Sequence, residues 1–127
     1  MSIKVVVLDS GRLPAGVDFP PLQIDKYGWE QYPQLNSDEI ADRCWRADIV
    51  VTLASRIDGA VLEKMSRVGL LICAGEACSR VDQTAAFASG VELLVFPEAE
   101  YSSIASAQDL CDRVCAAIDH YIRTARN

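Results

Sequence analysis

The chain has 127 residues, of which 50% are hydrophobic and 24% are charged, a balance typical of one ordinary globular domain. Twelve lysines and arginines against 18 aspartates and glutamates give a net charge of −6, which disfavours binding to nucleic acid or to an anionic membrane. The first apolar run, residues 5–8, stops at Asp9, far short of the roughly 20 residues of a spanning helix, so we expect a cytoplasmic protein.

The first half of the chain is predicted to contain three strands and one helix. Short apolar or β-branched runs next to turn residues indicate strands, here at residues 3–8, 22–27 and 47–53. The run 22–27 is shorter and more polar, so we expect it at an edge of the sheet. Asn36 is a suitable N-cap with acids after it, which predicts a helix through about Trp45.

The second half continues this alternation. Asp58 is expected to cap a helix with one apolar face. Two more buried strands are predicted at residues 68–73 and 91–96, and residues 82–88 form a short helix between them. Pro97 ends the last strand. Five strands alternating with helices predict a three-layer, doubly wound α/β fold with a parallel sheet.

A long helix is predicted from about Ser103 to Thr124. Its apolar residues recur at intervals of three and four, at Ile104, Ala107, Cys111, Val114, Ile118 and Tyr121. Leu110, Ala117 and Ile122 widen this stripe. We therefore expect one side of the helix to cover the sheet and the rest of its apolar surface to form a homodimer through residues 103–124.

Ligands of doubly wound sheets bind beyond the carboxyl ends of the strands, which points to the loops after Leu8, Thr52, Cys73 and Phe96. The usual phosphate-binding motifs are absent there, because the seven glycines are dispersed and form neither G-x-G-x-x-G nor a P-loop. The residues that a phospho-receiver domain or an FMN-binding loop needs are missing too. A nucleotide site of another kind stays open.

The five cysteines are an odd number and lack C-x-x-C spacing, so we favour buried thiols over disulfides or a metal site. Cys78 is the expected exposed thiol because it lies in a loop. That loop, residues 74–82, is the best candidate for chemistry. Its small residues suit an anion-binding nest of backbone amides, and they suit equally a tight turn with Asp82 as helix cap.

Several short segments, in order and spacing, resemble the D-isomer-specific 2-hydroxyacid dehydrogenases. They are residues 4–9, 47–52, 57–62, 81–86 and 89–92, then Pro97 with residues 101–103. The similarity is to the substrate-binding, flavodoxin-like domain of that family and covers nearly the whole chain. It implies a single domain over residues 1–127 with strand order 2-1-3-4-5 and a long C-terminal helix.

In that family, backbone amides of the loop after the fourth strand hold the substrate carboxylate. Ala77 stands where the family has glycine, and Gly75 lies two positions earlier, so the loop is either rebuilt or impaired as a carboxylate site. The segment after the third strand matches the family's second substrate loop. The resemblance thus implies a substrate-binding set of Ala54, Ser55, Arg56, Gly75, Glu76, Ala77 and Cys78.

The family's NAD motif and its catalytic arginine, glutamate and histidine belong to a second domain that follows the long helix. We therefore expect this chain to have no catalytic residue and no cofactor by itself, and to act as a small-carboxylate-binding or protein-interaction module. The alternative is a split dehydrogenase, in which a Rossmann-domain partner supplies NAD and the catalytic groups.

Overall fold

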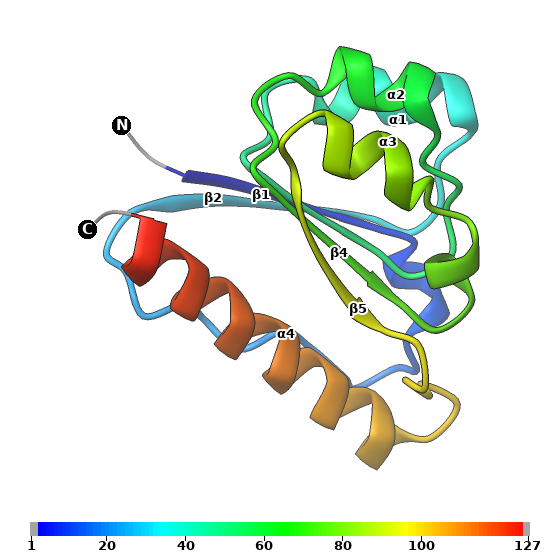
Figure 1. Cartoon of the computed structure of the whole chain (residues 1–127). Helices are drawn as coiled ribbons and strands as arrows, with labels where there is room; N and C mark the ends of the chain where they lie inside the picture. The colour runs from blue at the N-terminus through cyan, green and yellow to red at the C-terminus, as the bar shows by residue number, and fades with distance from the viewer. Residues whose placement is uncertain (1–2, 126–127) are drawn as a thin grey trace.

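The computed structural model describes residues 3–125 and shows a five-stranded parallel sheet in the order β2-β1-β3-β4-β5 (Figure 1). The strands are β1 (Ile3–Leu8), β2 (Tyr27–Tyr32), β3 (Ile49–Thr52), β4 (Leu70–Ala74) and β5 (Glu92–Phe96). Helices α1 (Ser37–Cys44), α2 (Gly59–Lys64) and α3 (Gln83–Ala88) lie on one face, and α4 (Ile104–Ala125) lies on the other. The predicted three-layer α/β fold and its strand order are confirmed.

The predicted bounds of the second strand were wrong. Residues 22–26 are irregular, and β2 begins at Tyr27, opposite Ile3, and ends at Tyr32, opposite Leu8. Leu22 is buried beneath α4 rather than in the sheet. A half-exposed edge strand carries fewer apolar residues than a buried one, so the apolar density of the sequence pointed to the wrong segment.

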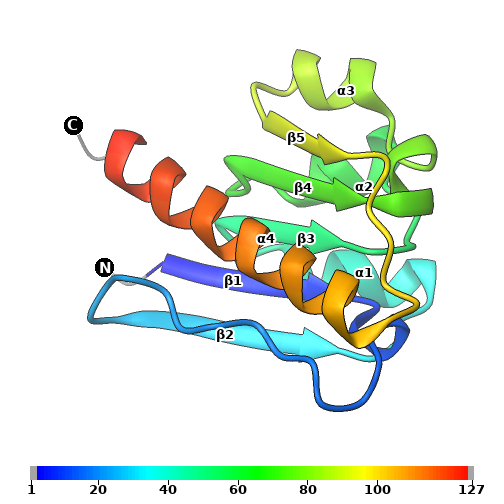
Figure 2. The same ribbon diagram turned by 90° about the horizontal axis from the view of Figure 1, so that it is seen from below.

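The sheet separates two hydrophobic cores, because side chains alternate between its faces. In β1, Val6 and Leu8 face α1 to α3, while Val5 and Val7 face α4. Figure 2 shows α4 crossing this second face with the segment before β2 beside it. All four residues are fully buried, which explains the unbroken apolar run of this central strand.

The predicted caps of the two short helices are confirmed. The side chain of Asp58 accepts a hydrogen bond from the backbone N–H of Val61 at 3.0 Å. In the same way, Asp82 accepts from the N–H of Ala85 at 2.9 Å. Each carboxylate satisfies an amide that the first turn of a helix leaves unpaired.

Helix α4 buries four residues of the predicted stripe, Ala107, Cys111, Val114 and Ile118, and it also buries Leu110 and Ile122. Ile104 is 61% exposed, and Ala117 is half-buried. The apolar surface that was expected to meet a second copy is thus largely used within the chain. A homodimer through residues 103–124 stays a prediction.

Across residues 3–125, no helix is both long enough and apolar enough to cross a membrane.

Candidate functional site

A cleft of about 470 Å³ lies at the carboxyl ends of β1 and β3. The sheet order places β2 and β3 on opposite sides of β1, so this is the topological switch point where such sheets bind ligands. The polar and charged side chains that line it include Asp9, Arg12, Ser37, Ser55, Arg56 and Arg80. The cleft has the volume of a small-molecule site.

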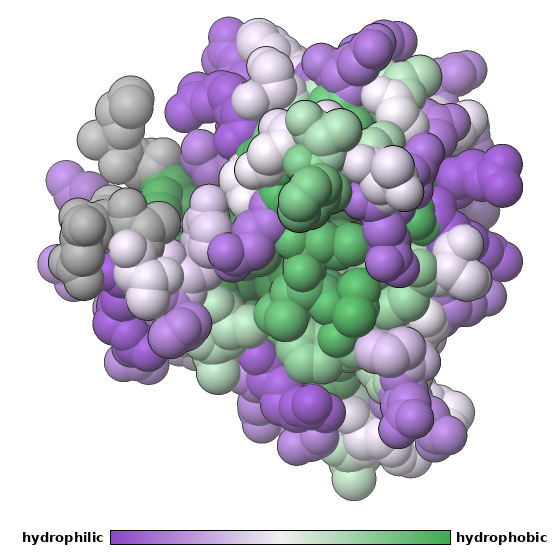
Figure 3. Space-filling model, viewed as in Figure 1, coloured by the Kyte–Doolittle hydropathy of each residue, from purple (hydrophilic) through white to green (hydrophobic). Residues whose placement is uncertain are grey.

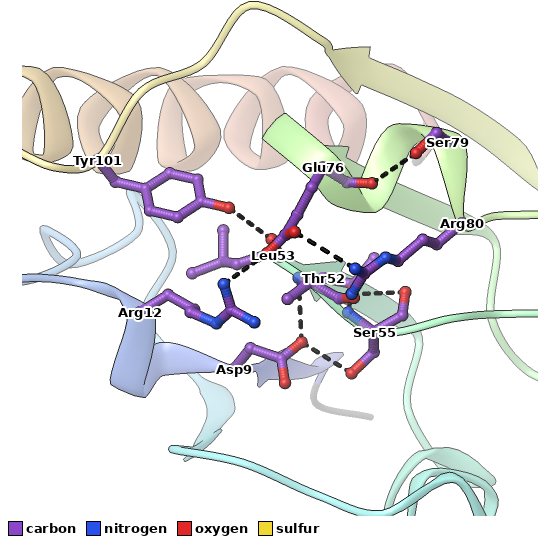
Figure 4. Close-up of polar contacts among 10 residues, drawn as sticks. Asp9, Arg12, Thr52, Leu53, Ser55, Glu76, Ser79, Arg80 and Tyr101 are labelled. Carbon is purple, nitrogen blue, oxygen red and sulfur yellow. Dashed lines mark hydrogen bonds and ion pairs between the residues drawn. The ribbon is translucent and has the colours of Figure 1, made fainter.

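Asp9 connects the two loops that form the base of this cleft. It is 6% exposed, and its carboxylate accepts hydrogen bonds from the N–H of Ala54 at 3.1 Å and from the hydroxyl of Ser55 at 2.7 Å (Figure 4). Its φ of 68° lies in the left-handed region, which costs energy for a residue with a side chain. The two hydrogen bonds join the end of β1 to the turn after β3.

The turn after β3 is closed by its own side chains. The N–H of Ser55 donates to the hydroxyl of Thr52 at 2.9 Å, and Thr52 is fully buried. The amides of Ala54 and Ser55 are therefore already hydrogen-bonded within the chain. What this turn presents to the cleft is the side chain of Arg56, which is exposed.

Three arginines against one aspartate give the lining a formal charge of +2. Glu76 pairs with two of them, with Arg12 on one side and with Arg80 at 3.4 Å on the other (Figure 4). Arg80 also donates to the carbonyl of Ala54 at 2.8 Å. Within residues 3–125, no carboxylate forms an ion pair with Arg56, so its guanidinium is the open cation of the cleft.

The loop after β4 is a short 3-10 helix, η2 (Gly75–Ser79). Gly75 begins it with a φ of +58°, while Ala77 is fully buried in the core. The left-handed position of this loop therefore lies at Gly75 and not at Ala77. A Cβ on Gly75 would lie 3.0 Å from the hydroxyl oxygen of Tyr101, so the close approach also requires glycine.

Tyr101 lies beside Gly75 and connects two segments of the chain next to the cleft. Its hydroxyl donates to the carbonyl of Leu53 at 2.7 Å, which ties the segment after β5 to the end of β3. Burial raises the pKa of Tyr101, and the negative charge of Glu76 adds to this effect. The hydroxyl thus stays protonated and remains a donor at neutral pH.

The structure brings only part of the predicted set to the cleft. Ala54, Ser55 and Arg56 line it, and Glu76 meets it through the arginines that it pairs with. Gly75, Ala77 and Cys78 belong to η2 and do not line the cleft. The thiol of Cys78 is half-buried and donates to the carbonyl of Cys73 at 3.2 Å, and the other four cysteines are buried.

The assignment of site residues by resemblance missed Asp9, Arg12 and Tyr101. Two of these follow the first strand directly, and the carboxyl end of that strand was already among the expected ligand positions. Nothing in the sequence pairs Arg12 with Glu76, because 64 residues separate them. The same holds for the contact between Tyr101 and Leu53.

The residues of this chain do not fit a nicotinamide dinucleotide held in the usual way. No glycine-rich G-x-G-x-x-G turn follows a strand, and that turn is what lets a backbone approach the pyrophosphate. Among residues 3–125, no group of three or more His, Cys, Asp or Glu side chains is placed to hold a metal ion. The cleft is suited to a small anion.

No family model matches the chain. A putative 2-hydroxyacid dehydrogenase of Haemophilus influenzae is 26% identical over 89 residues, which are 70% of this chain and 28% of that protein. In fold, the chain is similar to a solved structure described as the pyruvate reductase of Chlamydomonas reinhardtii, with a TM-score of 0.58 and 19% identity over 78% of this chain and 30% of that one.

The apo structure of D-lactate dehydrogenase from Escherichia coli is similar too. Its TM-score is 0.56 and its identity 16%, over 77% of this chain and 32% of that one. This chain therefore spans less than a third of the length of each of these three proteins.

Proposed function

Because this chain is related to the 2-hydroxyacid dehydrogenases, we propose that it is a counterpart of their substrate-binding domain and binds a small carboxylate in the cleft beside Arg56. The predicted resemblance to that family is confirmed by the sequence match, and two solved structures share the fold. In this proposal residues 1–127 form one domain that recognises an acid and has no dehydrogenase activity by itself.

The observation that carries the proposal is the free guanidinium of Arg56 in a cleft of positive formal charge. A guanidinium presents paired N–H donors that match both oxygens of a carboxylate. Asp9 and Thr52 hold the turn that carries Arg56, so its backbone is fixed before a ligand arrives. A fixed donor loses less conformational entropy on binding.

Isothermal titration of the whole chain with pyruvate, glyoxylate and D-lactate tests the site. We expect binding of at least one acid, and we expect Arg56→Gln to weaken it about tenfold or more, the order of a hydrogen bond to a charged group. Arg67→Gln is the matched control, because Arg67 is also exposed and pairs with Asp48 before β3, away from the cleft. Absence of heat with all three acids, or equal weakening by both variants, would contradict the proposal.

A second candidate function follows from the names of these similar proteins. Two of these proteins are named as dehydrogenases and one as a reductase, and this chain spans less than a third of each. Hydride transfer would then use NAD held by a separate Rossmann-domain protein. Oxidation of NADH with a 2-oxo acid by a complex purified through this chain would support it, and a purified complex that is inert with these substrates would count against it.

A further inference from the structure

An apolar patch lies over β5, at the open edge of the sheet. Figure 3 shows it as the green area at the centre of the molecule, where β5 runs between α3 and α4 in the same view (Figure 1). Phe87 of α3 is 86% exposed and Val95 is 38% exposed. Leu93, Leu94 and Phe96 are half-buried beside them.

The opposite edge of the sheet is different in character. Strand β2 carries Gly28, Glu30 and Gln31, and Glu30 forms an ion pair with Lys4 at 3.2 Å. Charged side chains are a common means of keeping an edge strand from pairing with another chain. Residues 93–96 of β5 have no charge, so this edge lacks that protection.

The backbone of β5 has free hydrogen-bonding groups in a defined pattern. The N–H of Glu92 donates to Gly69 at 2.9 Å, on the side of β4. Because successive residues of a strand direct their backbone groups to opposite sides, Leu94 and Phe96 also bond toward β4. The N–H and C=O groups of Leu93 and Val95 point to the open edge.

We propose that β5 is a homodimer interface, at which two copies of this chain pair antiparallel about a twofold axis through Leu94. In this register Leu93 of each copy lies opposite Val95 of the other. These are the residues with outward backbone groups, so each pair exchanges two N–H···O bonds, and Leu94 meets its own copy as a non-hydrogen-bonded pair. The two sheets join into one continuous sheet.

Charge complementarity supports this register. Glu92 of one copy lies opposite Phe96 of the other, and the guanidinium of Arg113 is 5.0 Å from the centre of the Phe96 ring. Among residues 3–125, the ion pair that Arg113 forms is a long, exposed one with Asp109 at 3.9 Å. Glu92 is exposed and, within residues 3–125, forms no ion pair. The dimer therefore gains two symmetric pairs between Glu92 and Arg113.

In the same proposed dimer, the face of β5 toward α3 is apolar. A hollow of about 500 Å³ lies next to β5, lined among others by Phe87, Gly90 and Leu93. The side chain of Val95 from the second copy projects to this face opposite Leu93, beside the hollow. Exposed apolar surface on both faces of one edge strand is thus covered by a single symmetric contact.

Proline at position 95 tests the pairing, because it removes an N–H that makes no bond within the sheet. Edge strands accept proline at such positions, so the monomer should keep its circular dichroism spectrum. We expect light scattering to give a dimer for the unaltered chain, and Val95→Pro to raise the dimer dissociation constant by about 100-fold, since the dimer loses two hydrogen bonds. If Val95→Pro does not fold, the charge variants Glu92→Lys and Arg113→Glu test the proposed interface instead.

The charge variants test the register without touching the strand backbone. Glu92→Lys and Arg113→Glu each place like charges together, and we expect each to weaken the dimer about tenfold, while the double variant restores it. Glu63→Lys, an exposed change on α2, is the control for net charge. A double variant no better than the single variants would overturn the register.

A dimer through α4 predicts a different result. Ile104 is a large exposed apolar residue of that helix, so Ile104→Lys would dissociate a helix-mediated dimer and leave a β5 dimer intact. A monomeric mass for the unaltered chain, or loss of the dimer in Ile104→Lys but in none of the β5 variants, overturns the proposal. Carboxylate binding at Arg56 is measured separately, so either proposal can fail alone.

Discussion

Asp9 combines three features that are rarely found together in one residue. It is buried, it has a carboxyl group, and it has a positive φ. The structure compensates through the two donors from Ala54 and Ser55, because a buried carboxylate is tolerated only when it is well hydrogen-bonded. A carboxylate of the chain itself thus occupies donors of the turn that the family resemblance assigned to a substrate.

Replacing Asp9 shows how much of the site depends on these bonds. We expect Asp9→Ala to lower the free energy of unfolding by about 2–4 kcal/mol, because it leaves the buried N–H of Ala54 without an acceptor. Asp9→Asn keeps one acceptor oxygen and tolerates positive φ, so it should cost about half as much. Urea unfolding measures both variants.

The control for these variants is Asp42→Asn, an exposed change on α1, which should leave stability within about 0.5 kcal/mol. Equal losses for the alanine and asparagine variants of Asp9 would mean that its hydrogen bonds do not hold the turn. The negative charge of Asp9, which both variants remove, would then be the main contribution.

The helices were easier to predict than the edge strand β2 because their ends carry local signals. Asp58 and Asp82 are read from the sequence as caps, and each accepts the expected backbone hydrogen bond. Strand β2 has no such marker, and its pairing with β1 depends on contacts about 24 residues away in the chain. Local chemistry determines a helix end, whereas a strand is defined by its neighbour.

The cap of α3 gives a prediction for a single element. Asp82→Ala should lower the free energy of unfolding by about 1 kcal/mol, the usual cost of losing an N-cap. Asp82→Asn keeps an oxygen acceptor and should be nearly neutral. Thermal unfolding followed by circular dichroism compares the two. A similar loss for both would show that the charge of Asp82, rather than its hydrogen bond to Ala85, stabilises the helix.

Buried thiols are distributed through the whole molecule. Burial raises the pKa of Cys44, Cys73, Cys111 and Cys115 to about 12, because the interior disfavours a thiolate. Cys44 and Cys73 lie in the core under α1 to α3, and Cys115 lies in the core under α4. Both faces of the sheet therefore respond to alkaline pH.

The sign of this response follows from the raised pKa. In the unfolded chain the thiols ionise near 9, while in the folded chain they remain protonated to about 12. Their contribution to stability is complete below pH 9 and is lost as the pH rises from 9 to 12, by up to about 1.4 kcal/mol per pH unit for each thiol. Cys44→Ala should reduce this loss of stability by the contribution of one thiol.

Urea unfolding between pH 8 and pH 10.5, with a reductant present, measures the loss. The unaltered chain and Cys44→Ala should diverge above pH 9 and run parallel below it. Parallel curves over the whole range would contradict the burial of Cys44 as the cause.

The sequence by itself determined the fold class, the order of strands and helices, the helix caps and the stripe of α4. These depend on periodicity and on residues close to one another in the chain. It also pointed to the turn that presents Arg56, since the carboxyl end of a parallel strand is a recurrent ligand position.

Only the tertiary structure decided which residues make the cleft and which surface is left open. Asp9 reaches a turn 45 residues away, and Glu76 joins arginines from two different loops. The apolar residues of β5 look in the sequence like those of any buried strand, and it is their place at the end of the sheet order that exposes them. Such contacts arise from the packing of distant segments, which a local pattern does not encode.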